Sequence, residues 1–154
     1  MKTKTIGLTL AFCFLAGAAC FAADPQIGSW KLNEAKSKFT RGTPKNTVVV
    51  YEAVGDQMKV TVEGTDAKGK PARNEWTGRF DGKDYPVTGD PTSDMRSYKK
   101  INDRTLEFTV RKNRKVMVTG RVVVSADGKS RTVTTSGTTP TGKKFKNTTV
   151  YDKQ

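Results

Sequence analysis

The sequence predicts an all-β protein: a single antiparallel up-and-down β-barrel of about eight to ten strands. Turn-forming pairs such as Asp81-Gly82 and Asp127-Gly128 recur along the chain, and short runs rich in Val, Thr, Tyr and Phe lie between them. Apolar and polar residues alternate in these runs, as in strands with one buried face. No long segment has helical periodicity. Many short strands joined by tight turns are typical of an antiparallel sandwich or barrel.

In the first half of the chain, turns containing glycine separate five strand-like runs. Alternation is clearest where Met58, Val60 and Val62 are interleaved with polar residues, which places one face of that strand in the core. The segment 34–46 has no strand character and has room for a short helix or a lid. The strands expected here are 27–33, 47–54, 57–65, 71–80 and 84–89.

In the second half, Leu106, Phe108 and Val110 alternate with polar residues in the same way. In the longest run the apolar phase passes through Gly120. This glycine either marks a bend or bulge at a barrel corner or gives a neighbouring aromatic ring room to pack. The strands expected here are 94–101, 105–112, 114–125, 130–138 and 144–152.

The first 22 residues are predicted to be a cleaved signal peptide, which leaves 23–154 as the barrel domain. Lys2 and Lys4 precede an apolar run, and small residues follow it up to Ala22. This order is typical of a secretory signal. The apolar run is too short for a transmembrane helix, which needs about 20 residues. We therefore expect the protein to be exported, and to be periplasmic or secreted.

We expect the exported protein to begin near Ala23 and to contain no thiol, because Cys13 and Cys20 both lie in the predicted leader. Intact mass and thiol titration of exported material test this. The alternative is a lipoprotein processed at Cys20, although Gly17 stands where such processing sites usually have Leu. A diacylated species that starts at Cys20 would establish that alternative.

Composition excludes several classes of function. The 154 residues contain no His, so a Ser-His-Asp triad, a Cys-His pair and a His-ligated metal are all absent. No loop has the spacing of a calcium site, and no pair of carboxylates stands out. We therefore expect no enzymatic activity, no cofactor and no metal.

The chain is strongly basic, with 28 Lys and Arg against 15 Asp and Glu. Many lysines lie in predicted turns rather than in one block, which is typical of a charged surface that aids solubility. The alternative is an anionic partner such as a polyanion or membrane headgroups. Basic and aromatic residues do not interleave as they do in proteins that bind single strands, so we expect no nucleic acid partner.

Gly28-Ser29-Trp30, followed by an antiparallel meander, resembles the calycin superfamily, which includes lipocalins and fatty-acid-binding proteins. The chain is most similar to small bacterial lipocalin-like exported proteins. The resemblance implies a structural role for Gly28 and for Trp30, which would close one end of the barrel. The Arg-x-Tyr of fatty-acid-binding proteins would fall on Thr149-Val150-Tyr151, where the Tyr is present and the Arg is not.

Six residues are candidates for ligand contact. Trp76 is in phase with Phe80 and is either core or cavity wall. The run 94–101 fits two phases: Met95, Ser97 and Ile101 point inward, or Arg96 and Tyr98 do and form an anion site. A bulge at Gly120 would also turn Arg121 inward. The predicted ligand-binding residues are Trp76, Phe80, Arg96, Tyr98, Phe108 and Arg121.

These observations predict a monomeric, non-catalytic protein that binds a small apolar or amphipathic molecule in the barrel, because the inward residues are mainly apolar. Many inward positions hold Thr, Ser or Gly, and only 8% of residues are aromatic, which favours a cavity over a solid core. The alternative is an envelope interaction protein with a filled barrel, either a protease inhibitor or a binder of anionic surfaces.

Overall fold

The computed structural model describes residues 24–139 and 141–154, which form ten strands and no helix. No helix that could cross a membrane occurs in these residues. The predicted leader, with Cys13 and Cys20, lies outside the described residues. The strands are β1 (Gly28–Lys38), β2 (Lys45–Val54), β3 (Gln57–Thr65), β4 (Pro71–Gly78), β5 (Asp81–Thr88), β6 (Met95–Asn102), β7 (Thr105–Lys112), β8 (Lys115–Val124), β9 (Ser130–Thr138) and β10 (Lys144–Lys153).

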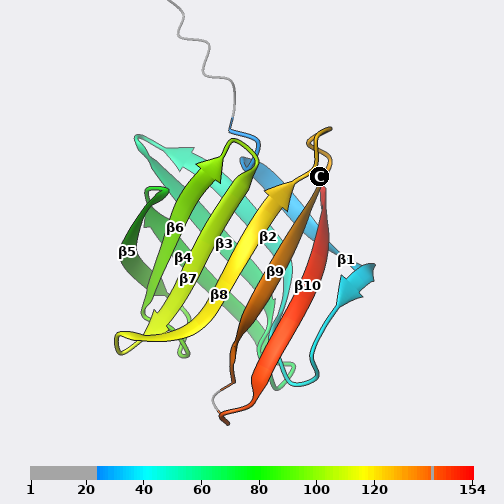
Figure 1. The fold of residues 1–154 in the computed structure, drawn as a ribbon, viewed down its shortest axis with the longest axis vertical. Helices are drawn as coiled ribbons and strands as arrows, with labels where there is room; N and C mark the ends of the chain where they lie inside the picture. Colours follow the sequence, from blue (N-terminus) through cyan, green and yellow to red (C-terminus); the bar gives the residue numbers. More distant parts are fainter. Residues whose placement is uncertain (1–23, 140) are drawn as a thin grey trace, which may run out of the picture.

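Each strand pairs antiparallel with its neighbours in the sequence, and β1 pairs with β10 to close the ring (Figure 1). The protein is thus a single closed up-and-down β-barrel, and the predicted fold class is confirmed. A ten-stranded antiparallel barrel fits a calycin-like fold. Because the barrel is closed, every strand is hydrogen-bonded to a neighbour on both sides, and no sheet edge is free. The shortest seam joins β4 to β5, where Glu75 lies opposite Thr88 and Trp76 opposite Val87.

The expectation that 34–46 lacks strand structure is wrong, because β1 continues to Lys38 through a bulge. One side chain, that of Ser37, bridges the bulge with two hydrogen bonds. Ser37 Oγ donates to the Asn33 carbonyl (2.7 Å) and accepts from the Val150 N–H (2.9 Å). These bonds replace the ladder bonds that the bulge removes. A six-residue connection, 39–44, then leads into β2 without a helix.

The two ends of the barrel differ, and we name them by what covers them. At the closed end, the segment before β1 crosses the opening, and Gln26 is only 1% exposed. Its side-chain Nε2 donates to the Arg104 carbonyl (3.4 Å), and its own carbonyl accepts from Trp30 Nε1 (2.9 Å). Trp30 is fully buried there. The closed end carries the connections 55–56, 79–80, 103–104 and 125–129.

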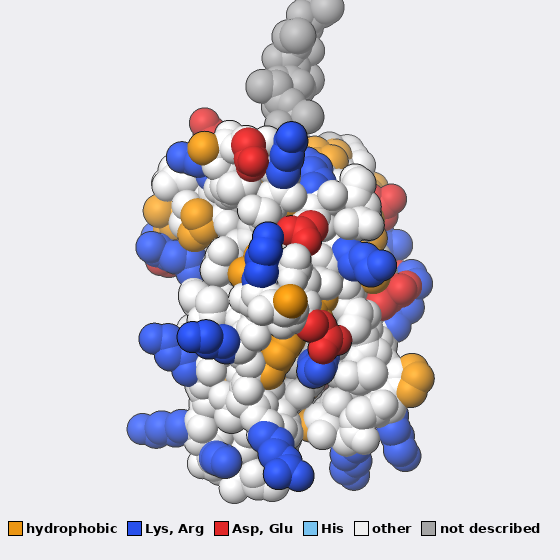
Figure 2. Space-filling model, turned by 90° about the vertical axis from the view of Figure 1, so that its right-hand side faces the viewer, with side chains coloured by type: hydrophobic (Ala, Val, Ile, Leu, Met, Phe, Trp, Pro, Cys, Tyr) orange, Lys and Arg blue, Asp and Glu red, His pale blue; other side chains and the backbone are white. Residues whose placement is uncertain are grey.

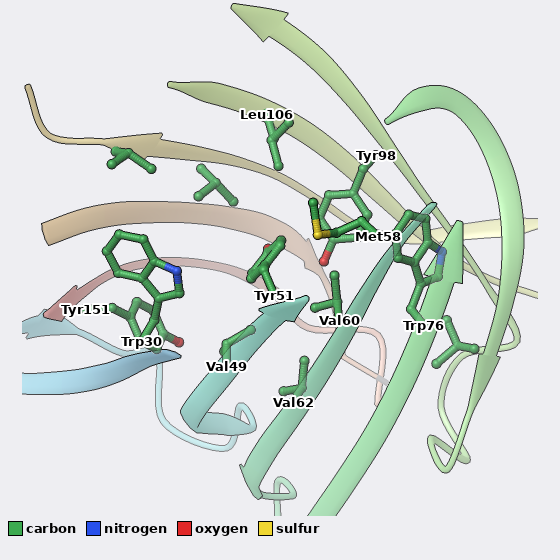
Figure 3. Packing of buried hydrophobic residues seen from close by; sticks show 13 residues of the cluster. Trp30, Val49, Tyr51, Met58, Val60, Val62, Trp76, Tyr98, Leu106 and Tyr151 are labelled. Carbon is green, nitrogen blue, oxygen red and sulfur yellow. The ribbon is translucent and has the colours of Figure 1, made fainter. Parts of the chain in front are cut away.

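Aromatic rings fill the half of the barrel next to the closed end. Trp76, Phe80 and Tyr98 are in mutual contact, with ring centroids 4.7–6.3 Å apart. Tyr51 lies 6.3 Å from Tyr98 and joins this group to the Trp30 region, as Figure 3 shows. Stacked and edge-to-face contacts of these kinds add to the energy of burial. This half of the barrel is therefore core.

Gly120 gives an aromatic ring room to pack, which decides between the two roles proposed for it. It lies opposite Phe108 in the ladder, and a Cβ at this position would overlap the Phe108 ring. The ladder between β7 and β8 keeps its register through Gly120, and its bulge lies elsewhere, between Val110 and Arg111. Alternation of inward and outward side chains therefore continues unbroken past Gly120.

Candidate functional site

The open end of the barrel is the end opposite Trp30. Inward-facing residues near this end, such as Asn74, Val110, Val118 and Thr135, are half-buried rather than buried, so solvent reaches the interior from here. Small and β-branched side chains predominate among them, in contrast with the aromatic rings that fill the half of the barrel next to the closed end. The open end carries the connections 39–44, 66–70, 89–94, 113–114 and 139–143.

Arg96 is the charged side chain that the structure places between the aromatic core and the open end. It lies opposite Tyr85 and Val110, and Tyr98 lies opposite Phe108, so Arg96 and Tyr98 take the inward phase of β6. Arg96 is 7% exposed. The alternative phase, with Met95 and Ile101 inward, is wrong, because pairing with β5 and β7 sets the register.

The Arg96 guanidinium has few partners. Its Nη2 donates to Asn74 Oδ1 (3.1 Å), while its buried Nε has no hydrogen-bond partner. None of the ion pairs among the described residues includes Arg96. A buried cation without a carboxylate is unfavourable unless another group compensates its charge. The site therefore suits an anion that brings acceptor oxygens to Arg96.

A second buried cation, Arg131, was not anticipated from the sequence. It is 2% exposed and faces three aromatic rings: the guanidinium carbon lies 4.8 Å from the centroids of Trp30 and Tyr51 and 5.2 Å from that of Tyr151. These ring faces compensate part of its charge. The period of two in β9 places Arg131 in phase with Val133, which is a signal that sequence reasoning could have used.

Burial also affects the phenols around Arg131. It raises the pKa of Tyr51 far above the usual range, and the nearby Tyr98 adds to this, although the Arg131 charge opposes the shift. Burial likewise raises the pKa of Tyr151, whose hydroxyl donates to the Asn46 carbonyl (3.0 Å). Both phenols therefore stay protonated well above neutral pH, and neither supplies a negative charge to the barrel interior.

The expectation that Arg121 turns inward is wrong. Because alternation is unbroken at Gly120, Arg121 points outward, where its Nη2 forms an ion pair with Glu107 Oε1 (2.8 Å). Its side chain is about half exposed. Arg121 and Arg96 are therefore on opposite sides of the barrel wall.

The predicted aromatic residues lie at different depths. Trp76 is 1% exposed, and its Nε1 donates to the Arg96 carbonyl (2.8 Å). Phe80 stacks on Trp76 within the core. Phe108 is half-buried and lies 5.6 Å from Tyr98, so these two rings form the boundary between the core and the open half.

Gly28 has a positive φ of 127°, and a Cβ there would crowd Lys153, which lies over the Trp30 ring.

The connection 39–44 covers part of the open end. Asn147, an inward residue of β10, accepts from the Thr40 N–H (2.7 Å) and donates to Thr43 Oγ1 (3.0 Å). Thr43 and Asn147 are both buried. Thr40 Oγ1 also donates to the Lys146 carbonyl (3.0 Å), so the connection is held against β10, and the segment expected to be a short helix or a lid is a loop.

Two shallow cavities, of about 360 and 350 Å³, lie on the outer surface of β7–β10. Both include Thr119 and Ser136, whose hydroxyls are 3.3 Å apart. Lys146 borders the larger cavity, and Phe145 borders the smaller. In the described part of the chain, no three His, Cys, Asp or Glu residues come close enough to hold a metal ion.

No protein-family model matches the chain, and no curated protein matches it. Among solved structures, the chain is similar to a redesigned β-barrel, mFAP1, bound to DFHBI, with 15% identity and a TM-score of 0.48 over 86% of this chain and 98% of that one. It is also similar to a second redesigned β-barrel, b11L5F_LGL, with 15% identity and a TM-score of 0.45 over 88% of this chain and 97% of that one.

Proposed function

We propose that the protein binds a small apolar or amphipathic molecule, with at most one anionic group, through the open end of the barrel. The observation that carries this proposal is Arg96, which is buried and has no carboxylate partner and an unpartnered Nε. A carboxylate or similar anion would supply that partner. The apolar residues around it, such as Val62 and Val110, would contact the rest of the molecule.

Substitution of Arg96 by Gln is expected to weaken binding of an anionic ligand. A buried charge-assisted hydrogen bond is worth about 1.5–3 kcal/mol, or roughly 10- to 150-fold in affinity. Fluorescence titration with a fatty acid and with the corresponding alcohol measures this preference. Arg121→Gln is the matched control, because it removes an exposed guanidinium and should leave the preference unchanged.

Two results would contradict the proposal. If the wild type prefers the acid and Arg96→Gln preserves that preference, the anion does not bind at Arg96. If neither the acid nor the alcohol binds, the barrel is not a carrier of such molecules.

We further propose that the protein is an exported, monomeric and non-catalytic member of the calycin superfamily, related to its small bacterial lipocalin-like proteins. The closed antiparallel barrel with Trp30 at its closed end supports the family assignment. The leader pattern in the sequence supports export, and the lack of His supports a binding role rather than catalysis.

A second candidate function is an envelope interaction protein, either a protease inhibitor or a binder of anionic surfaces. The packed rings of Tyr51, Trp76, Phe80 and Tyr98 favour it, because they fill half of an interior in which the sequence suggested a cavity. It predicts partner binding that is unaffected by Arg96→Gln, because Arg96 is buried.

A further inference from the structure

Positive charge is concentrated at the open end of the barrel. The five connections of that end, each taken with the strand residue on either side, contain ten Lys or Arg against three Asp. The four connections of the closed end, counted in the same way, contain three against four Asp. On the face shown in Figure 2, acidic side chains extend from the closed end to past the middle of the barrel, and the tip at the open end shows basic ones. The net charge of the chain is therefore unevenly distributed along the barrel axis.

These basic residues are mostly free to contact a partner. Of the ten, one forms an ion pair within the described residues, namely Lys45 with Glu34. Lys68, Lys70, Lys115 and Lys144 are exposed on three different hairpins. Cations on several hairpins around one opening form a ring rather than a line. A ring matches a flat anionic surface better than a thread-like polyanion, which is better accommodated by a groove.

Apolar side chains lie among these cations. Val116 follows Lys115 and is 48% exposed. Met117 and Phe145 border the same shallow cavity as Val116, together with Lys144. Val116 is exposed, and Met117 and Phe145 are half-buried. Apolar groups beside lysines gain by contact with the headgroup and acyl boundary of a bilayer, whereas a water-soluble polyanion has no apolar region for them to contact. The chemistry of this end is therefore that of a membrane surface.

We propose that the open end of the barrel docks on the surface of a lipid bilayer that contains anionic phospholipid. This rests on the proposed function: docking would place the opening that leads to Arg96 against the bilayer that holds an amphipathic ligand. The ligand would then pass between bilayer and barrel with little exposure of its apolar part to water. Attraction to the bilayer comes from the basic ring, with Val116, Met117 and Phe145 at the contact.

The test is co-sedimentation with phosphatidylcholine vesicles prepared with and without phosphatidylglycerol, using protein whose N-terminus has been established by intact mass. The test variant carries Lys68→Gln, Lys70→Gln, Lys115→Gln and Lys144→Gln. The matched control, with the same change in net charge away from the open end, carries Lys31→Gln, Lys83→Gln, Lys99→Gln and Lys129→Gln. All eight lysines are exposed.

The wild type is expected to bind vesicles only when phosphatidylglycerol is present, and to be released between about 0.1 M and 1 M salt. Each lysine near a charged bilayer is worth roughly fivefold in partitioning, so the test variant, which lacks four of them, should bind on the order of several hundredfold more weakly. The control should retain most of the affinity. Near-ultraviolet circular dichroism verifies that both variants remain folded.

Three outcomes would overturn the proposal: no binding by the wild type, equal losses in the two variants, or binding to dextran sulfate but not to the anionic vesicles. The first shows that there is no docking, the second that net charge alone acts, and the third that the ring binds polyanions. The proposed function fails separately, in the titration with acid and alcohol. Vesicle binding without ligand binding would reject the carrier and keep the docking surface.

Discussion

Replacing Trp30 by Ala is expected to lower the free energy of unfolding by about 3–5 kcal/mol, as for other buried aromatic residues. The indole is fully buried, and its N–H donates to the Gln26 carbonyl. Its removal opens a cavity at the closed end and releases the segment that crosses this end. It also takes away one of the three rings around Arg131, whose Nε and Nη1 have no hydrogen-bond partner. Cavity and charge effects therefore act in the same direction.

Urea unfolding followed by tyrosine fluorescence or circular dichroism measures this change. Trp30→Phe retains a ring over Arg131 and loses the N–H bond, so it should cost less than Trp30→Ala. Val123→Ala removes a side chain that is 42% exposed and should change stability by less than about 0.5 kcal/mol. A Trp30→Ala protein with an unchanged unfolding midpoint would show that this residue does not hold the closed end together.

The fold was predictable from the sequence because its signals are local. Asp127-Gly128 lies in the turn after β8, and Gly128 has the positive φ that such turns require (70°), whereas Asp81-Gly82 is the start of β5, directly after the turn at 79–80. Because every connection is short, with two to six residues, strands next to each other in sequence become neighbours in space. The meander therefore follows from the turn positions, and the expected strands agree with the observed ones to within a few residues except at the end of β1.

The extension of β1 was not predictable, because its bulge depends on contacts distant in sequence. Ser37 accepts from the backbone of Val150, 113 residues further along the chain. No pattern in the residues near Ser37 predicts such a bond. The connection after it depends in the same way on Asn147, which holds Thr40 and Thr43.

The candidate site was only partly predictable. The run around Arg96 contains polar residues in both phases, so alternation could not choose between them, and only pairing with β5 and β7 does so. The prediction for Arg121 is wrong because it depends on a bulge at Gly120, whereas Gly120 stays in register and the Phe108 ring fills the space beside it. The phase that Arg131 shares with Val133 indicates an inward position, but the three rings that compensate its charge come from β1, β2 and β10 and are visible only in the fold.

Stability is expected to fall steeply above about pH 10, and Tyr51→Phe should reduce that fall. Burial raises the pKa of Tyr51 and of Tyr151 in the folded state, while in the unfolded chain both ionise near their usual value of 10.0. Below that value both states carry the proton, and the contribution to stability is complete. Above it the unfolded state loses protons that the folded state keeps, so the contribution is lost as the pH rises.

Linkage gives the size of this effect. Each such tyrosine lowers the free energy of unfolding by about 1.4 kcal/mol per pH unit between the unfolded and folded pKa values. Urea unfolding at several pH values measures the slope, and Tyr51→Phe or Tyr151→Phe should each remove about this much of it. Phe108→Leu is the control, because it perturbs the same interior without removing a hydroxyl and should leave the slope unchanged. A Tyr51→Phe slope equal to that of the wild type would show that the phenol ionises as readily in the barrel as in water, despite its burial against Tyr98 and Arg131.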